Sequence, residues 1–192
     1  VVIVGAGTVG TCATKAFLGM GAHVTVLDTE LNALQMLYEH CPGVVTAMAN
    51  PVNIARSMAY ADIAVGAILV PDQHPPMVIT REMVRSMKPR SVVMDISIDE
   101  GGCIETSRPT THEHPTYVEE GMIHYCVPNM PSVVARTATY AFLNAAFPYI
   151  EAISNKGVDV AVLNDPSLEH AICTYRGDIK HVARFSPLAQ LE

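Results

Sequence analysis

Charge is scarce in this chain of 192 residues, and positive charge is the scarcer of the two signs. Only 16% of the residues are charged, and the 12 Lys and Arg form no cluster, so the net charge at pH 7 is -7. Proteins that bind nucleic acids carry basic patches that neutralise phosphates. We therefore expect no nucleic-acid partner. With 49% apolar residues, the chain has instead the material for a large buried core.

Long apolar runs and ordered cysteine patterns are also missing. No apolar run approaches the ~20 residues that a membrane-spanning helix needs, so we expect no membrane partner. The five cysteines are scattered and odd in number, without the spacing of a zinc site. His112 and His114 share one loop, but two imidazoles are weak evidence for a metal. We expect no metal, and a protein of the reducing cytoplasm.

The first 28 residues carry the most informative pattern. Val1–Val4 is an apolar run, a helical pattern follows a glycine-rich turn, and a second apolar run at 23–27 ends in Asp28. Strand, glycine turn, helix, strand and acid together form the dinucleotide-binding fingerprint. Because the chain starts inside the first strand without Met, we expect it to be part of a longer protein. The turn reads Gly5-Ala6-Gly7-Thr8-Val9-Gly10.

Each residue type in the fingerprint has a physical task. Gly5 permits the tight turn, Gly7 lets the backbone approach a pyrophosphate, and Gly10 lets the helix pack closely on the sheet. The free N–H groups at the helix start would face that pyrophosphate. Asp28 follows Gly5 by 23 positions and would bind the ribose hydroxyls of adenosine. With Glu30 nearby it disfavours a 2′-phosphate, so we expect NAD rather than NADP. A degenerate domain that binds nothing is the alternative.

Beyond this motif, strands alternate with helices along the chain. That order predicts an α/β fold of the Rossmann type, with a doubly wound parallel sheet and right-handed crossovers. The further strands are expected at 44–47, 61–69, 91–98 and 122–127, and the helices at 31–37, 53–60 and 80–87.

The residues that follow each strand are the candidates for a ligand site, because ligands bind beyond the carboxyl ends of parallel strands. Leu69 follows the fourth strand, Asp99 the fifth, and Asn129 the sixth. We expect this rim to form the floor for a nicotinamide and a small polar substrate. Asp95, inside the fifth strand, reads as a hydrogen-bonded structural carboxylate. For Asn129, a turn and a functional role both remain open.

The pattern changes after residue 136. A long helix is expected at 137–155, interrupted at Pro148 and stopped at Gly157, with apolar residues on most faces. So apolar a helix must be buried against something. Short helices are expected at 158–163 and 167–174. We divide the chain into a NAD-binding domain, 1–136, and a segment, 137–192, that completes another domain or stands as a satellite on it.

Several of these segments resemble bacterial alanine dehydrogenases, in the alanine dehydrogenase and pyridine nucleotide transhydrogenase family. The resemblance covers essentially the whole chain, as the carboxyl-terminal half of that enzyme. The most specific segments are the run around Asp99 and the Asn129-Met130-Pro131 turn. The segments are Gly5–Gly10, Gly66–Pro71, Asp95–Thr106, Arg108–His112, Pro115–Tyr117 and His124–Pro131.

The resemblance implies NAD-dependent, reversible deamination of L-alanine to pyruvate and ammonia, with Asp99 as a catalytic acid/base. Asn129 would lie beside the nicotinamide, and Asp28 would hold the ribose. The family's substrate-gripping lysine and arginine and its catalytic histidine would lie upstream of Val1, so the chain alone is expected to be inactive. Residues 137–192 would then complete a substrate domain whose amino-terminal part is absent. Glu100 stands where the family commonly has glutamine. The other implied cofactor contacts are Ile68, Leu69, Ile98, Met130 and Pro131.

Two other functions remain open. The NAD-binding domain of a proton-translocating transhydrogenase would need a membrane partner and a second nucleotide domain. A non-catalytic NAD-binding module would need neither, and the missing substrate-gripping residues favour it for this chain taken alone. The family resemblance further implies a homo-oligomer, commonly a hexamer, for the full-length protein.

Overall fold

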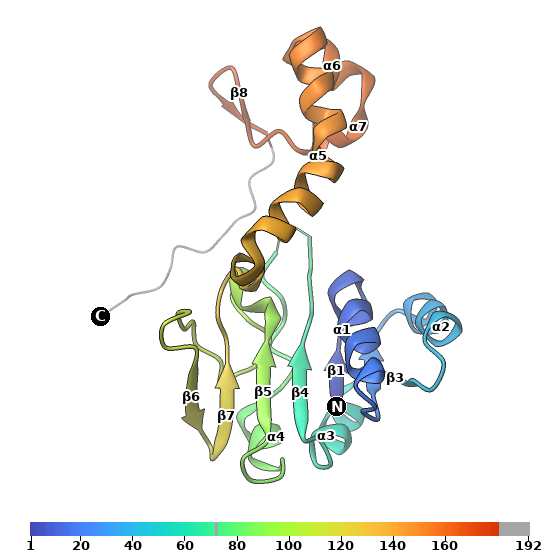
Figure 1. Ribbon diagram of the computed structural model, residues 1–192, viewed down its shortest axis with the longest axis vertical. Helices are drawn as coiled ribbons and strands as arrows, with labels where there is room; N and C mark the ends of the chain where they lie inside the picture. The colour runs from blue at the N-terminus through green and yellow to red at the C-terminus, as the bar shows by residue number, and fades with distance from the viewer. Residues whose placement is uncertain (72, 181–192) are drawn as a thin grey trace. The chain divides into compact units, whose positions relative to one another are not determined.

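The computed structural model describes residues 1–71 and 73–180, and the chain divides into two compact units between Met130 and Pro131. In the first unit the described residues form one sheet with the strand order β3-β2-β1-β4-β5-β7-β6 (Figure 1). Its strands are β1 (Val2–Val4), β2 (Thr25–Asp28), β3 (Val45–Met48), β4 (Ile63–Gly66), β5 (Val92–Asp95), β6 (Thr116–Glu119) and β7 (Met122–Tyr125). Its α-helices are α1 (Thr8–Gly19), α2 (Leu31–His40), α3 (Pro51–Met58) and α4 (Arg81–Arg85).

The expected Rossmann-type sheet is confirmed. Strands β3, β2, β1, β4, β5 and β7 are parallel, and β1 pairs with both β2 and β4. The chain therefore reverses its direction of winding between β1 and β4, which is the topological switch point of such a sheet.

Strand β6 is an exception that the sequence did not predict. It pairs antiparallel with β7 through a turn at Glu120 and Gly121, whose φ angles are 51° and 80°. Two central residues with positive φ are typical of a tight hairpin turn. Strand β6 lies at the edge of the sheet. Because its segment contains polar residues, it lacks the apolar run that marks the other strands in the sequence.

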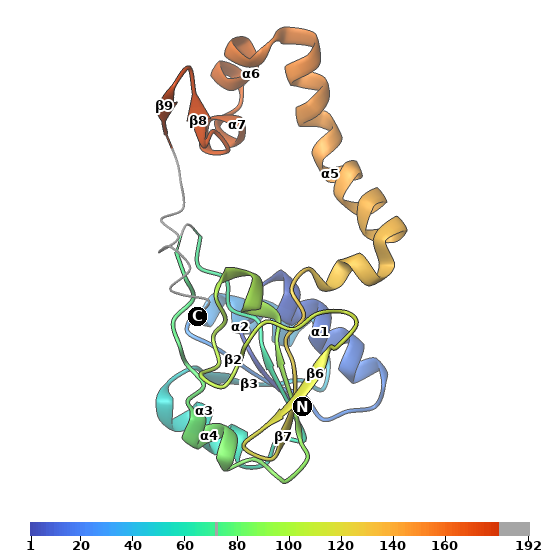
Figure 2. The same cartoon turned by 90° about the vertical axis from the view of Figure 1, so that its left-hand side faces the viewer.

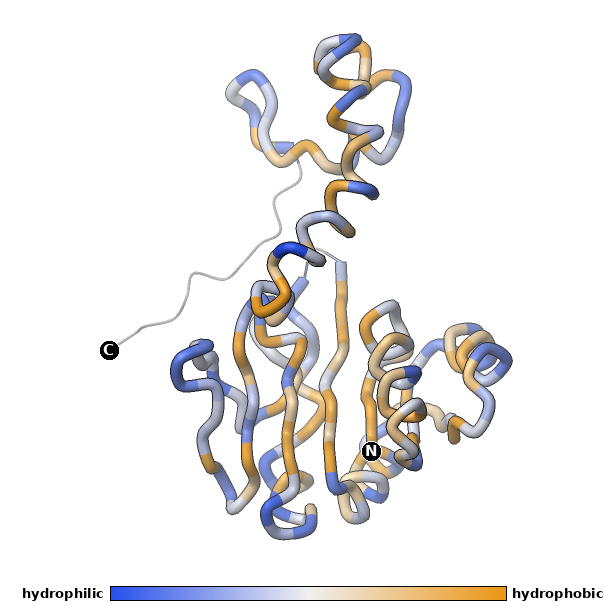
Figure 3. The backbone as a smooth tube through the Cα atoms, in the orientation of Figure 1, coloured by the Kyte–Doolittle hydropathy of each residue, from blue (hydrophilic) through white to orange (hydrophobic). Residues whose placement is uncertain are grey.

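The alternation of side chains along each strand builds a core on both faces of the sheet. On one face Ile3, Val26 and Val65 pack with Leu34 and Leu37 of α2. The opposite face is covered by α3 and α4 (Figure 2). Figure 3 shows how strongly apolar residues are concentrated in the central strands. The second face buries Val2, Val4, Ala64 and Val93 with Ile54, Met58, Val84 and Met87.

The expected strand at 91–98 is only half correct. Strand β5 ends at Asp95, and the chain continues in a short 3-10 helix, η1 (Ile96–Glu100). The Asp95 carboxylate caps this helix, and Gly101 follows it with φ of 107°. The alternating Ile residues favoured a strand, but the capping acid and the glycines after it turn the chain. Asp99 therefore lies in a helical turn rather than directly at a strand end.

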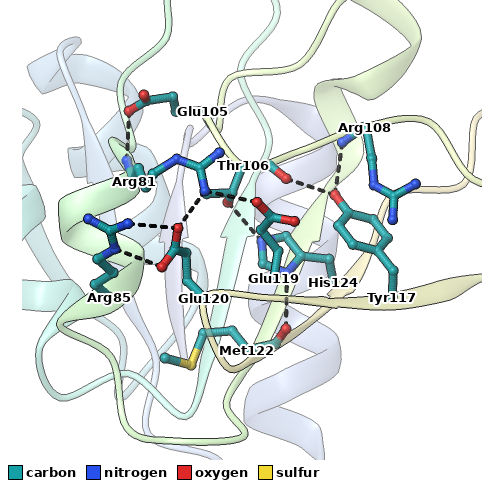
Figure 4. A network of polar contacts seen from close by, with 10 residues as sticks. All are labelled: Arg81, Arg85, Glu105, Thr106, Arg108, Tyr117, Glu119, Glu120, Met122 and His124. Carbon is teal, nitrogen blue, oxygen red and sulfur yellow. Dashed lines mark hydrogen bonds and ion pairs between the residues drawn. The ribbon is translucent and has the colours of Figure 1, made fainter.

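At the β6–β7 edge, His124 is fully buried and has partners at both ring nitrogens (Figure 4). Nδ1 donates to the carbonyl of Met122 at 3.1 Å, and Nε2 lies 2.8 Å from the hydroxyl oxygen of Thr106. The ring of Tyr117 stacks on it with the centroids 5.0 Å apart. Burial lowers the pKa of His124, so the imidazole stays neutral at pH 7. His124 is thus a core histidine of this sheet edge.

Three ion pairs fasten α4 to the end of β6 and to the turn that follows it: Arg81 pairs with Glu119 and Glu120, and Arg85 pairs with Glu120. Arg81 Nη1 lies 2.8 Å from Glu119 Oε1, and Arg85 Nε lies 2.6 Å from Glu120 Oε2. Hydrogen bonds from Arg85 and Arg81 lower the pKa of Glu120 to about 2. These pairs are partly open to solvent, so they fix the position of α4 more than they stabilise the fold.

The second unit contains a long helix, α5 (Ala135–Lys156), preceded by the 3-10 helix η2 (Met130–Val134). Helix α5 ends at Gly157 as expected, but it runs through Pro148 without the expected interruption. A proline inside a helix removes one hydrogen bond and need not end the helix. None of the residues of α5 is buried, and Phe142 and Phe147 are 69% and 58% exposed. No helix in the described ranges is both long and apolar enough to cross a membrane.

The rest of this unit differs from the sequence prediction at one point. After α6 (Val158–Asn164), helix α7 (Pro166–His170) ends four residues before the expected position. The chain then forms a hairpin of β8 (Thr174–Tyr175) and β9 (Asp178–Ile179). Its turn contains Arg176 and Gly177, both with positive φ. Two such residues favour a hairpin, and this preference overrides the helical pattern of the preceding residues.

Candidate functional site: a cavity at the switch point of the sheet

A cavity of about 760 Å³ opens at the carboxyl ends of β1, β2 and β4. Its wall includes Gly5 and Gly7 after β1, Asp28 at the end of β2, and Ile68 and Leu69 after β4. This is the switch point, where ligands bind in open α/β sheets, and the volume suits a small organic ligand. Among the predicted cofactor contacts, the structure brings together Gly5, Gly7, Thr8, Val9, Asp28, Ile68 and Leu69 at this cavity.

The packing requires glycine at two positions of the turn and leaves the third one open. A Cβ on Gly5, whose φ is 111°, would lie 2.2 Å from the carbonyl oxygen of Ala67. A Cβ on Gly10 would lie 1.9 Å from the carbonyl oxygen of Gly5. At Gly7 a Cβ would meet nothing within 4 Å. Gly5 and Gly10 thus serve the turn and the helix–sheet packing, while Gly7 borders open space.

The amino terminus of α1 points its free donors toward this space. Gly7 is the N-cap residue of α1, and in the described structure no side-chain hydrogen bond caps the start of this helix. Thr8 and Val9 are exposed and line the cavity. The N–H groups of a first helical turn have no partner within the helix, and they carry the positive end of the helix dipole. An anionic group such as a diphosphate therefore fits here.

Asp28 is held in place by two backbone amides. Its Oδ2 accepts a hydrogen bond from the N–H of Ala6 at 2.6 Å, and its Oδ1 accepts one from the N–H of Glu30 at 2.8 Å. Each carboxylate oxygen has a second lone pair that remains available for a ligand hydroxyl. Ala6 and Gly10, two other predicted contacts, are buried and support the turn without lining the cavity.

A second set of acceptors follows β5. Asp95 is fully buried, and its carboxylate accepts hydrogen bonds from the N–H groups of Ser97 and Cys103 at 3.1 Å and of Ile104 at 3.2 Å. Burial raises the pKa of Asp95, and these hydrogen bonds oppose that shift. The same burial, together with the charge of Asp95, raises the pKa of Cys103 to about 12, which argues against a nucleophilic thiol. Asp95 is thus the structural carboxylate that the sequence predicts.

Ser97 and Asp99 continue the series toward the neighbouring loops. Ser97 Oγ accepts a hydrogen bond from the N–H of Ile68 at 2.9 Å, and Asp99 Oδ1 accepts one from the N–H of Asn129 at 2.8 Å. Asn129 has φ of 51°, so the residue also forms a turn. Asp99 and Asn129 are exposed and lie together, although neither lines the cavity. Of the other predicted contacts, Ile98 is buried, Met130 is half-buried, and Pro131 begins the second unit.

Part of the cavity wall was not predicted from the sequence. Asn50, the N-cap residue of α3, lines it together with Pro51 and Ile54. Because Asn50 closely follows β3, the rule that selects residues after each strand points to it as well. Met77 and Met83 also line the cavity. They come from a loop and a helix that reach the site only through the tertiary fold, and no local pattern marks them.

The fold, the glycine turn and the acid at the end of β2 define a domain of the Rossmann class. Residues 1–182 match the family model of the alanine dehydrogenase/PNT C-terminal domain. The chain is 46% identical over 185 residues to an alanine dehydrogenase of Methanococcus maripaludis, covering 95% of this chain and 50% of that protein. The alanine dehydrogenase of Bacillus subtilis is 42% identical, with 95% and 49% covered. This chain belongs to the alanine dehydrogenase/PNT family, and it spans about half the length of the curated relatives it matches.

Solved structures agree with this assignment. An L-alanine dehydrogenase superposes with a TM-score of 0.86 at 37% identity, over 95% of this chain and 50% of that one. A transhydrogenase from Sinorhizobium meliloti superposes with a TM-score of 0.70 at 26% identity, over 79% and 43%. The similarity to the dehydrogenase is thus the greater by coverage, identity and geometry.

The geometry of Asp95 generates a first prediction. Asp95→Asn should lower the free energy of unfolding by about 3 kcal/mol. The NH2 group of Asn would replace one of the carboxylate oxygens, and it cannot accept hydrogen bonds from the backbone N–H groups. Chemical denaturation measures the change. Asp62→Asn is the matched control, since Asp62 is exposed and its ion pair with Lys88 is open to solvent, and it should leave the stability close to that of the wild type. Equal stability of the two variants would contradict the structural role of Asp95.

Proposed function

We propose that this chain is the NAD-binding portion of an L-alanine dehydrogenase, which reversibly deaminates L-alanine to pyruvate and ammonia. The observation that carries the proposal is the cavity at the switch point, bordered by the uncapped amino terminus of α1 and by the anchored carboxylate of Asp28. The greater similarity to alanine dehydrogenases favours this activity over a transhydrogenase domain or a module without catalysis.

The residues of the cavity fit NAD in particular. A diphosphate would lie over Gly7 and accept hydrogen bonds from the first turn of α1. The ribose hydroxyls would donate to Asp28, with Glu30 also in the wall. Neither Lys nor Arg is among the described residues that line the cavity, so a 2′-phosphate would meet negative charge without a compensating cation.

Asp99 is the proposed acid/base of the reaction. When bound, the nicotinamide supplies a hydride acceptor for the Cα of alanine. Deamination then needs a group that exchanges protons with the imine and with the carbinolamine formed by its hydration. The N–H of Asn129 holds one carboxylate oxygen of Asp99 in place, and the other oxygen would take part in this exchange. Asn129 itself would lie beside the nicotinamide, with Ile68, Leu69, Ile98, Met130 and Pro131 around it.

The groups that bind the substrate carboxylate would come from sequence outside this chain, so the chain alone should not oxidise alanine. We assign residues 137–192 to the substrate domain of the full-length protein, because the apolar residues of α5 are exposed and would pack against the rest of that domain. We further propose a cytoplasmic homo-oligomer, a hexamer in the full-length protein.

The choice of cofactor generates a prediction for the chain itself. The wild type should bind NADH more tightly than NADPH, and Asp28→Asn should reduce this ratio about tenfold, because the repulsion of the 2′-phosphate weakens. Titration by fluorescence measures both affinities, and their ratio separates the charge effect from any general loosening of the turn. Glu39→Gln, the same change on an exposed acid of α2 outside the cavity, is the control. Equal affinity of the wild type for both cofactors would contradict the proposed role of Asp28.

The role of Asp99 requires the full-length enzyme. Asp99→Asn should lower kcat by ~10²–10⁴-fold, because an amide keeps the acceptor for Asn129 but cannot exchange a proton. The affinity for NADH and the melting temperature should change little. Steady-state kinetics, NADH titration and thermal unfolding of this one variant are sufficient. Near-normal turnover with a lowered melting temperature would instead assign Asp99 a purely structural role.

A further inference from the structure

Strand β5 is flanked by two buried serines that both bind the neighbouring segment of chain around β4. Before the strand, Ser91 Oγ donates a hydrogen bond to the carbonyl of Ala61 at 3.1 Å. After the strand, Ser97 Oγ accepts one from the N–H of Ile68 at 2.9 Å. The two residues are 6% and 5% exposed, so they are matched in burial, and each bonds to a backbone group, although Ser91 donates and Ser97 accepts. They differ in position, because only Ser97 lies at the end of the sheet that carries the cavity.

Ser97 holds the segment that follows β4. This segment forms part of the cavity wall, and several contacts fix its backbone. The N–H of Ala67 donates to the carbonyl of Val4 at 2.8 Å, and the carbonyl of Ala67 lies against Gly5 of the glycine turn. Below it, a Cβ on Gly66 would lie 2.4 Å from the Cys103 sulfur. The hydrogen bond to Ser97 is a further contact that holds this segment, and it is made by the backbone N–H of Ile68 itself. Ile68 lines the cavity and Ser97 does not.

We propose that Ser97 is a positioning residue for the bound dinucleotide, and this inference rests on the proposed cofactor site. Its hydroxyl oxygen accepts a hydrogen bond from the N–H of Ile68. This bond fixes the position of the segment after β4 relative to the glycine turn. Without the hydroxyl, the N–H of Ile68 is left with the thiol sulfur of Cys103, which is a weaker acceptor, and the segment after Gly66 is held less firmly. If this segment becomes ordered only when the ligand binds, the entropy lost in ordering it lowers the affinity. If the segment is already ordered, binding does not carry this cost.

The test compares Ser97→Ala with Ser91→Ala in the whole chain, with NADH as the probe. Each variant loses the buried hydrogen bond to the segment around β4, so both should show a modest decrease in melting temperature. Ser97→Ala should bind NADH about three- to tenfold more weakly than the wild type, and Ser91→Ala within about twofold of it. In the absence of NADH, hydrogen exchange of the Ile68 amide should accelerate in Ser97→Ala and remain unchanged in Ser91→Ala.

The outcomes separate this inference from the function on which it rests. If the wild type binds NADH and Ser97→Ala binds it equally well, the positioning role is wrong and the cofactor site stands. An equal loss of NADH affinity in both variants would also overturn the role, because it would reflect general stability. If the wild type does not bind NADH, both the cofactor site and the inference fail.

Discussion

The buried carboxylate of Asp95 is the constraint on which the carboxyl-terminal rim of the sheet depends. It accepts three backbone N–H groups, those of Ser97, Cys103 and Ile104, and thereby folds the segment after β5 back on itself. A buried carboxylate without these donors would be strongly unfavourable, so the loop conformation and the burial of the acid require each other. The loop also leaves no room for side chains at its glycines, since a Cβ on Gly102 would lie 2.9 Å from Asp95 Oδ2.

From this fixed point, alternate residues reach the neighbouring loops. Ser97 holds the segment after β4 and Asp99 holds the segment after β7. On the other side of the switch point, Asp28 holds the glycine turn in the same way, through the N–H of Ala6. Side-chain acceptors at the strand ends thus hold the backbone of adjacent loops in place through contacts within the chain itself. Such preorganisation spares the binding step the cost of ordering the loops.

The sequence predicts those parts of the site that local chemistry determines. Gly5, Gly7, Asp28 and the residues after β4 are specified by short-range patterns, and the structure places them in the wall of the cavity. The structural role of Asp95 follows from its place inside an apolar strand. The similarity of this chain to alanine dehydrogenases agrees with the resemblance seen in the run around Asp99.

The errors arise where distant parts of the chain decide the outcome. The end of β5 at Asp95 depends on the N–H groups of Cys103 and Ile104, which the alternating pattern at 91–98 does not reveal. Strand β6 forms because β7 offers a free edge, not because its own residues are apolar. Met77 and Met83 reach the cavity only through the packing of α4 and the loop before it. Pro148 remains inside α5, although local preference predicts an interruption there.

The most direct test of a preformed dinucleotide site is a crystal structure of the chain with NADH. We expect the diphosphate at the amino terminus of α1 above Gly7, the adenosine ribose on Asp28, and a Cα displacement of the rim loops below ~1 Å relative to the free chain. NADH bound away from the switch point would contradict this expectation. So would rim loops displaced by several ångströms, because the hydrogen bonds to Asp95, Ser97 and Asp99 would then not be the framework of the site.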